Sequence, residues 1–148
     1  MQLSDLLSGN CTKSAVPCSS KKRAIEIISE LAAEQLGVDS QELFECLLAR
    51  EKMGSTGIGG AIAIPHGRIP DELPLTGVLL TLEHPIPFDA IDNQPVDILF
   101  ALLVPESQCK EHLQTLGQIA KKLSDKNLCR QLRLADSDEM LYQLITAP

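Results

Sequence analysis

The segment that most constrains the fold of this chain is an almost uninterrupted apolar run over residues 96–104. A strand that is apolar on both faces is buried on both faces, so helices have to cover the sheet from above and below. A second strand is predicted over residues 77–82, and Asp92-Asn93 between the two is a turn signal. A shorter β-type run over residues 61–64 stops at a proline. The sequence therefore predicts an α/β fold, a single three-layer α/β/α sandwich with a mixed sheet flanked by helices.

Two helices are predicted ahead of the short β-type run. The first is capped by Ser19 or Ser20 and stopped by Gly37, a residue that tolerates the left-handed turn at a helix end. In the second, Asp39 and Glu42 form a capping-box variant at the start. Each helix carries an apolar face for the sheet. These faces consist of Ala24, Ile27, Ile28, Leu31 and Ala32 in the first helix, and Leu43, Phe44, Leu47 and Leu48 in the second.

Three further helices are predicted after the long apolar run. Ser107 caps the first of them, and two short helices follow near residues 127–132 and 137–145. Asp136 and Glu139 are the expected capping pair of the last helix. The apolar face of the first of the three consists of Leu113, Leu116, Ile119, Ala120 and Leu123.

Composition indicates one domain that spans residues 1–148. The chain is 44% hydrophobic and 22% charged, which is typical of a globular protein rather than a disordered one. Its net charge of −7 comes with scattered basic residues, so no nucleic-acid partner is expected. No apolar run approaches the ~20 residues of a membrane span, so no membrane insertion is expected. Residues 1–18 should form an irregular arm with one short strand or turn around residues 11–16, without the features of a signal peptide.

The cysteines indicate a reducing compartment. They are odd in number and form no Cys-x-x-Cys pair, so free thiols in the cytoplasm are the simplest account. Cys109 and His112 lie at a helical i, i+3 spacing that a metal could use. Structural zinc sites need four ligands, however, and the sequence contains no second pair of this kind. We therefore expect neither a metal nor a cofactor. The five cysteines are Cys11, Cys18, Cys46, Cys109 and Cys129.

The candidate site lies where the short β-type run ends in Pro65-His66-Gly67. Pro65 cannot donate a ladder hydrogen bond and Gly67 permits an abrupt change of direction, so the strand should end there. His66 would then stand at a strand terminus, where open α/β sheets bind ligands. Upstream lie Arg50 and the loop 54–60, which is rich in small residues and backbone N–H groups. An imidazole, a guanidinium and an anion-accepting loop together suggest phosphate chemistry on histidine.

Other interpretations of these residues have to be weighed. A lone histidine beside a turn is often a structural residue, and His84, next to Pro85, is expected to be an exposed turn residue of this kind. The glycine loop lacks the Gly-Lys-Ser/Thr ending of a P-loop, which argues against nucleotide hydrolysis. It also has Ile62 where a dinucleotide-binding motif has its third glycine, and it leads into a strand rather than a helix.

Residues 50–67 read REKMGSTGIGGAIAIPHG and resemble the active-site signature of the type-2 IIA proteins of the bacterial phosphotransferase system. This group includes mannitol, fructose and nitrogen-related IIA domains. The resemblance covers nearly the whole chain, and residues 21–33 and 88–97 resemble the free-standing, nitrogen-related branch in particular. Ala61 stands where a glycine is more usual in the family. Since a Cβ is poorly tolerated at positive φ, we expect an ordinary backbone conformation at this position.

The resemblance implies a role for each candidate residue. His66 receives the phosphoryl group as a tele-phosphohistidine intermediate, although the residues themselves do not distinguish the two ring nitrogens. Arg50 clamps the phosphoryl oxygens, and Arg68 is a second candidate cation. His112, in the first turns of a helix, is a neutral ring that donates an N–H to a phosphate oxygen. Neutral phosphate-binding donors are expected from Ser55, Thr56 and Gly57.

The predicted function is that of a phosphocarrier and regulatory protein of the nitrogen-related phosphotransferase system, a phosphotransferase component. The implied donor is a histidine-phosphorylated HPr-like carrier protein. Regulatory targets, with potassium-transport or sensor-kinase regulators as candidates, would respond to the phosphorylation state by packing on an apolar rim of Ile58, Ile64 and Ile69. Two alternatives stay open: a sugar-specific, fructose/mannitol-type IIA component that passes phosphate to a IIB domain, and an interaction module whose histidine is never phosphorylated.

Overall fold

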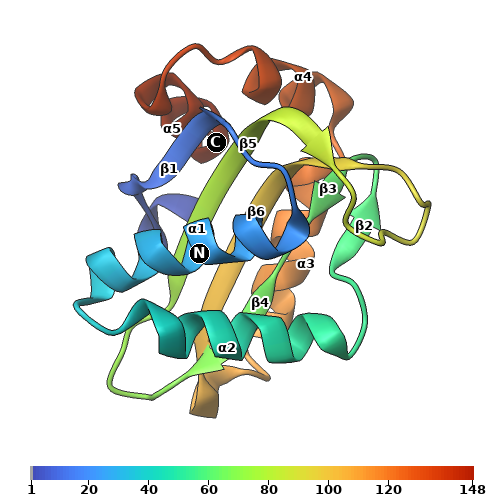
Figure 1. The fold of residues 1–148 in the computed structure, drawn as a ribbon. Coiled ribbons are helices and arrows are strands. Elements are labelled where there is room, and N and C mark those ends of the chain that lie inside the picture. Colours follow the sequence, from blue (N-terminus) through green and yellow to red (C-terminus); the bar gives the residue numbers. More distant parts are fainter. Residues whose placement is uncertain (1) are drawn as a thin grey trace.

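The computed structural model describes residues 2–148, which contain one six-stranded sheet (Figure 1). Its strand order is β1-β5-β6-β3-β2, and β4 pairs with β6 along the edge that β3 also uses. β5 and β6 are antiparallel, whereas β1 runs parallel to β5, and β3 and β4 run parallel to β6. The predicted mixed sheet is confirmed. The strands are β1 (Leu7–Val16), β2 (Gly57–Gly59), β3 (Ile62–Ala63), β4 (His66–Ile69), β5 (Thr76–Ile86) and β6 (Val96–Pro105).

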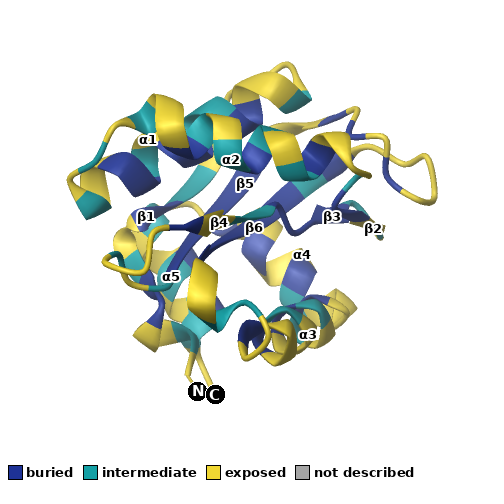
Figure 2. Cartoon of the chain, turned by 90° about the horizontal axis from the view of Figure 1, so that it is seen from below, coloured by how far each residue is buried: buried dark blue, intermediate teal, exposed yellow. Residues whose placement is uncertain are grey.

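Helices cover both faces of this sheet, as the buried character of β6 requires. Figure 2 shows α1 and α2 on one face and α3, α4 and α5 on the other. All of β6 except Asp97 is buried between these layers. Within residues 2–148, no helix is long and apolar enough to cross a membrane. The helices are α1 (Lys21–Leu36), α2 (Ser40–Lys52), α3 (His112–Leu123), α4 (Lys126–Leu134) and α5 (Asp138–Thr146), with short 3₁₀ turns at Leu3–Asp5 and Glu106–Gln108.

The ends of the first two helices follow local capping chemistry. Ser20 caps α1 by accepting the Arg23 N–H at 3.1 Å, and Gly37 ends it in the left-handed conformation with φ +70°. Asp39 caps α2 by accepting the Gln41 N–H at 3.0 Å, but it forms no capping box with Glu42. Both helix starts are therefore confirmed, and the second uses a simpler cap than predicted.

The expected irregular arm at the N-terminus is instead the ten-residue edge strand β1. Cys11 and Thr12 are fully buried in it, and its pairing with β5 is interrupted by two register shifts. Ala15 has φ +51°, and its N–H donates to the hydroxyl of Thr81 on β5 at 2.9 Å. These irregularities break the alternation by which a strand is recognised in sequence. The short strand predicted around residues 11–16 is part of β1, whereas the prediction of an irregular arm before it was wrong, because only pairing with β5 identifies residues 7–10 as a strand.

Two predicted helix caps after β6 are also wrong. Ser107 lies in the 3₁₀ turn, and its N–H donates to Asp71 at 2.8 Å, so α3 begins only at His112. Leu113, which was predicted on the apolar face of this helix, is 66% exposed, while Thr115 is buried. In α5 the cap is Ser137, which accepts the Met140 N–H at 3.0 Å, rather than the predicted acidic pair. α3 therefore starts later than the predicted cap and without a side-chain cap, whereas α5 starts directly after a serine that follows Asp136.

The chain around the predicted third strand differs from expectation in two ways. Ala61 has φ +69°, because it completes the tight connection between β2 and β3. The expectation of an ordinary backbone there was wrong. Pro65 interrupts the strand, yet the chain does not turn away: β4 continues along β6, and the Pro65 carbonyl accepts the Leu102 N–H at 2.8 Å. Gly67 is required for another reason, since a Cβ there would lie 2.5 Å from Sγ of Cys46 on α2.

Candidate functional site

His66 is the first residue of β4, and its two ring nitrogens have different partners. Nδ1 lies 2.9 Å from the carbonyl oxygen of Ile64, which can only accept a hydrogen bond. Nδ1 therefore carries the proton in the neutral ring, and Nε2 keeps its lone pair. Burial, and then the nearby Arg50 charge, lower the pKa of His66 below its ordinary value. The half-buried ring is thus a neutral nucleophile with its free lone pair on Nε2.

Arg50, in the last turn of α2, faces this lone pair. Its Nε–H donates to Nε2 of His66 at 3.2 Å, and its Nη1–H donates to the carbonyl of Gly54 at 2.8 Å. The guanidinium is held between the loop and the imidazole. An anion that reached Nε2 would therefore meet a permanently charged, planar donor at once.

His66 opens into a pocket of about 540 Å³. Arg68 and His112 line the same pocket, and its wall includes no carboxylate among residues 2–148. In a chain of net charge −7, this pocket carries the local positive charge that an anion needs. The remaining wall is small or apolar and includes two exposed side chains, Met53 (83% exposed) and Leu113 (66% exposed). Its other members are Ala49, Gly67, Val104, Cys109 and Leu116.

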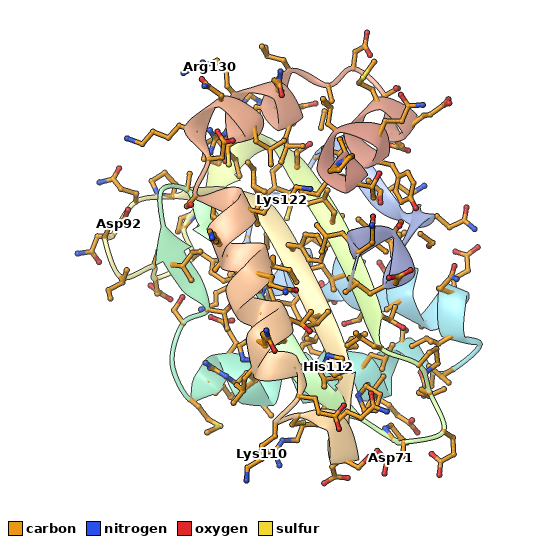
Figure 3. The ribbon with its side chains drawn as sticks, turned by 180° about the vertical axis from the view of Figure 1, so that it is seen from behind. Asp71, Asp92, Lys110, His112, Lys122 and Arg130 are labelled. Carbon is orange, nitrogen blue, oxygen red and sulfur yellow. The ribbon has the colours of Figure 1, made fainter. Side chains whose placement is uncertain are left out.

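His112 lies at the start of α3, and Figure 3 shows it at the end of the helix opposite Lys122. The ring is buried, with Nδ1 2.9 Å from the Thr115 hydroxyl and Nε2 3.1 Å from Oε1 of Gln108. Because the amide oxygen only accepts, Nε2 carries a proton. The pocket thus contains a second imidazole, with an N–H on Nε2. To donate to a phosphate, the Nε2–H of His112 must give up its hydrogen bond to Gln108.

The three expected neutral donors do not line this pocket. The Ser55 hydroxyl donates to the carbonyl of Phe88 at 2.8 Å and accepts the Gly57 N–H at 3.0 Å. Both the N–H and the hydroxyl of Thr56 donate to the carboxylate of Glu51. Gly57 belongs to β2, where a Cβ would lie 2.7 Å from Cβ of Ala90. The structure thus engages all three residues in holding the loop.

The predicted apolar rim is also corrected. Ile64 and Ile69 are buried in the core, at 5% and 2% exposure. Ile58 is exposed but lines a separate groove between β2 and the α3–α4 corner. The apolar residues exposed beside His66 are Met53 and Leu113. Nothing in the sequence distinguished them, because Leu113 fits the helical apolar pattern and Met53 follows directly after α2.

Glu51 and Lys21 are further residues that the sequence did not single out. The Glu51 carboxylate is buried, with Nζ of Lys21 2.9 Å from Oε2. A glutamate near a helix end resembles a solvated surface residue in sequence, so no local signal identified it. His84, in contrast, is exposed as expected, although it lies in β5 rather than in a turn. All five cysteines are free thiols.

Comparisons with known proteins show which family this chain belongs to. A family model described as phosphoenolpyruvate-dependent sugar phosphotransferase system, EIIA 2, matches residues 5–147. A nitrogen regulatory protein of Klebsiella oxytoca is 64% identical over 147 residues, 99% of this chain and 91% of that protein. The corresponding protein of Escherichia coli (strain K12) is 63% identical over 147 residues, 99% and 90% of the two chains. Nitrogen regulatory protein IIA-Ntr from Neisseria meningitidis has a solved structure that matches with a TM-score of 0.87, at 36% identity, over 97% of this chain and 99% of that one. This chain therefore belongs to the EIIA 2 family of the phosphoenolpyruvate-dependent sugar phosphotransferase system.

Proposed function

We propose that this chain is a phosphocarrier and regulatory protein of the nitrogen-related phosphotransferase system. It accepts a phosphoryl group on Nε2 of His66 from a histidine-phosphorylated, HPr-like carrier protein. The observation that carries the proposal is the polarity of this ring: Nδ1 is occupied by the Ile64 carbonyl, while the Nε2 lone pair faces Arg50 at the pocket. The relatives named nitrogen regulatory protein support the regulatory part of the proposal.

The transfer step follows from this tautomer. The Nε2 lone pair attacks the phosphorus of the donor's phosphohistidine, and a new N–P bond forms. The donor's N–P bond breaks, and its electron pair returns to the donor imidazole. The proton stays on Nδ1, hydrogen-bonded to the Ile64 carbonyl, so no proton has to leave the His66 ring before attack. Because the pKa of His66 is lowered, the attacking neutral form predominates at neutral pH.

Positioning and charge stabilisation supply the rest of the catalysis, since the transition state of phosphoryl transfer is loose and anionic. The Arg50 guanidinium turns from Nε2 to the equatorial oxygens of the moving group, where its planar fork offers two donors. Arg68 adds a second positive charge at the rim of the pocket. The Nε2–H of His112 exchanges its Gln108 partner for a phosphoryl oxygen. The predicted product is a tele-phosphohistidine at His66.

The regulatory part of the proposal uses the exposed side chains of Met53 and Leu113. A target protein that packs on these two residues buries the mouth of the pocket. A phosphoryl group there adds about −1.5 to −2 charge at neutral pH. Burying it is unfavourable, so the phosphorylation state of His66 sets the affinity for such a target.

The test is incubation with the phosphorylated carrier, followed by mapping of acid-labile phosphate. Label is expected on wild-type protein and on the control variant His84→Ala, whose site is exposed and remote in sequence. His66→Ala should take no label and still unfold cooperatively. Label in His66→Ala, or label that maps to His112 or His84, contradicts the assignment. Onward transfer to a dedicated IIB domain favours the sugar-specific alternative, and an unlabelled wild-type protein favours the interaction module.

A further inference from the structure

Glu51 is a buried carboxylate next to Arg50 at the end of α2, yet it does not line the pocket. Only 6% of its surface is exposed. Its Oε2 accepts the N–H of Thr56 at 2.8 Å, and its Oε1 accepts the Thr56 hydroxyl at 2.5 Å. Lys21 of α1 completes the group, with Nζ 2.9 Å from Oε2. A buried carboxylate is unfavourable unless it is paired and hydrogen-bonded, so these contacts depend on one another.

Lys21 has further partners in the segment before β6. Its Nζ donates to the carbonyl of Phe88 at 3.3 Å and lies 4.7 Å from the centre of the Phe88 ring. Asp89, an exposed residue, lies 3.8 Å from the same ammonium group. Lys21 therefore connects α1 to the end of α2 through Glu51, and to the segment before β6 through Phe88 and Asp89.

These contacts fix the loop that follows α2, which Figure 1 shows leading from α2 up to β2. The Gly54 N–H donates to the backbone carbonyl of Glu51 at 3.2 Å, and Thr56 is held by the Glu51 side chain. Between these two anchors, the Gly54 carbonyl accepts Nη1–H of Arg50 at 2.8 Å. The Nε–H of the same guanidinium reaches His66 at 3.2 Å. The direction of the Arg50 fork thus depends on a loop that Glu51 holds at both ends.

We propose that Glu51 is a positioning residue, whose carboxylate fixes the loop from which the Gly54 carbonyl orients Arg50 toward Nε2 of His66. The expected effect on the rate of phosphoryl transfer rests on the proposed function. The expected effect on the contact between Arg50 and His66 is independent of that function. A displacement of about 1 Å in a positioned group can cost roughly 100-fold in rate. We therefore expect Glu51→Gln to slow phosphoryl transfer by roughly 10- to 100-fold.

The sign of a change in the His66 pKa separates positioning from a direct effect of the Glu51 charge. Burial lowers this pKa most and the hydrogen bond to the Ile64 carbonyl raises it, while the Arg50 charge lowers it and the Glu51 charge raises it. Loss of the Glu51 charge alone would lower the pKa further. Displacement of Arg50 from Nε2 removes a nearby cation and raises it. Because the Arg50 guanidinium touches Nε2 at 3.2 Å whereas Glu51 does not line the pocket, positioning predicts a net rise, with Arg68 and His112 unchanged in the pocket.

Glu51→Gln is best compared with Asp97→Asn as a matched control. Asp97 is another largely buried carboxylate in an ion pair, with Nε of Arg133 2.9 Å from Oδ2, and it does not line the pocket. Single-turnover transfer per folded molecule and an NMR titration of the unphosphorylated His66 ring are measured for both variants. We expect slower transfer and a raised His66 pKa in Glu51→Gln, and neither change in Asp97→Asn.

If Glu51→Gln fails to fold, two variants of Thr56 test the same contact from the other side of the hydrogen bond. Thr56→Val removes the hydroxyl that Oε1 accepts and changes no charge, whereas Thr56→Ser keeps it. Slow transfer in the valine variant, regained in the serine variant, supports positioning. Wild-type rates in both Glu51→Gln and Thr56→Val, with a His66 pKa that is unchanged or lowered, would overturn it. A wild-type protein that takes no label contradicts the proposed function instead and leaves the pKa comparison intact.

Discussion

At the scale of single residues, Arg50 carries the charge on which the proposed transfer depends. Its fork donates to two different acceptors, Gly54 and His66, which a lysine ammonium cannot reproduce in the same plane. Arg50→Lys should therefore slow transfer by about 2–4 kcal/mol in activation free energy, roughly a hundredfold or more. The free energy of unfolding should change by no more than ~0.5 kcal/mol, as for other surface substitutions.

The matched control is Arg68→Lys, at an exposed position of the same pocket where no hydrogen bond within residues 2–148 holds the guanidinium in place. It should retain most of the wild-type rate. Single-turnover transfer and denaturant unfolding give the two quantities. A wild-type transfer rate in Arg50→Lys would show that the guanidinium geometry is not needed and that Arg50 contributes only a positive charge at the end of α2.

Ala61 provides a second test at this scale, because its φ of +69° is unfavourable for any residue with a Cβ. The left-handed conformation costs roughly 1–2 kcal/mol, while a glycine costs roughly 0.5–1 kcal/mol in unfolded-state entropy. Ala61→Gly should therefore stabilise the protein by about 0.5–1 kcal/mol, measured by thermal or denaturant unfolding. Ala49→Gly, at an exposed position within α2, should destabilise it by a similar amount. If both variants lost the same free energy of unfolding, the backbone of Ala61 would not be strained.

At the scale of elements, the contact between α2 and β4 depends on Gly67. A Cβ at this position would lie 2.5 Å from Sγ of Cys46, and that sulfur donates to the Arg68 carbonyl at 2.7 Å. Gly67→Ala should thus push α2 away from β4 and destabilise the fold by about 1–3 kcal/mol, as overpacking does. Gly9→Ala is the control, because a Cβ there meets nothing within 4 Å.

Removal of the sulfur should relieve the strain at this contact. The double variant Gly67→Ala with Cys46→Ala is expected to be more stable than the two single losses predict, since residues in contact couple. If the losses of unfolding free energy in the two single variants simply add up in the double variant, then α2 and β4 are not in steric conflict at Cys46.

At the scale of the whole molecule, phosphorylation should control binding to regulatory targets. A chain of net charge −7 gains about −1.5 to −2 more charge at the mouth of the pocket. A target that packs on Leu113 should bind the unmodified form at least roughly tenfold more tightly, because of the unfavourable burial of phosphate and like-charge repulsion. Calorimetric titration of one target against both forms at matched salt measures this ratio.

Substitutions at two exposed leucines test whether a target binds at the mouth of the pocket rather than elsewhere on the molecule. Leu113→Ala should weaken binding of the unmodified form, whereas Leu134→Ala, at a 76% exposed leucine of α4, should leave it unchanged. Equal affinities of the phosphorylated and unmodified forms would exclude the switch and leave only phosphate relay.

The sequence by itself determined the features whose physical cause lies within a few residues. An apolar run identified β6 as a strand buried on both faces, and serine and glycine caps marked both ends of α1. The segment from Arg50 to His66 contained the two residues that the structure joins at 3.2 Å. Short-range periodicity, capping and motif spacing were sufficient for these parts, because their energies do not depend on distant partners.

Only the tertiary structure decided the features whose partners are remote in the chain. β1 is a strand because β5 pairs with it, and Ser55 is structural because Phe88 accepts its hydroxyl. Ala61 has a positive φ in the β2–β3 connection, where its carbonyl accepts the N–H groups of Asp97 and Ile98. Glu51 is buried because Lys21 and Thr56 satisfy its carboxylate. In each case a hydrogen bond, an ion pair or a close approach outweighs the local preference, and the partner's position exists only once the chain has folded.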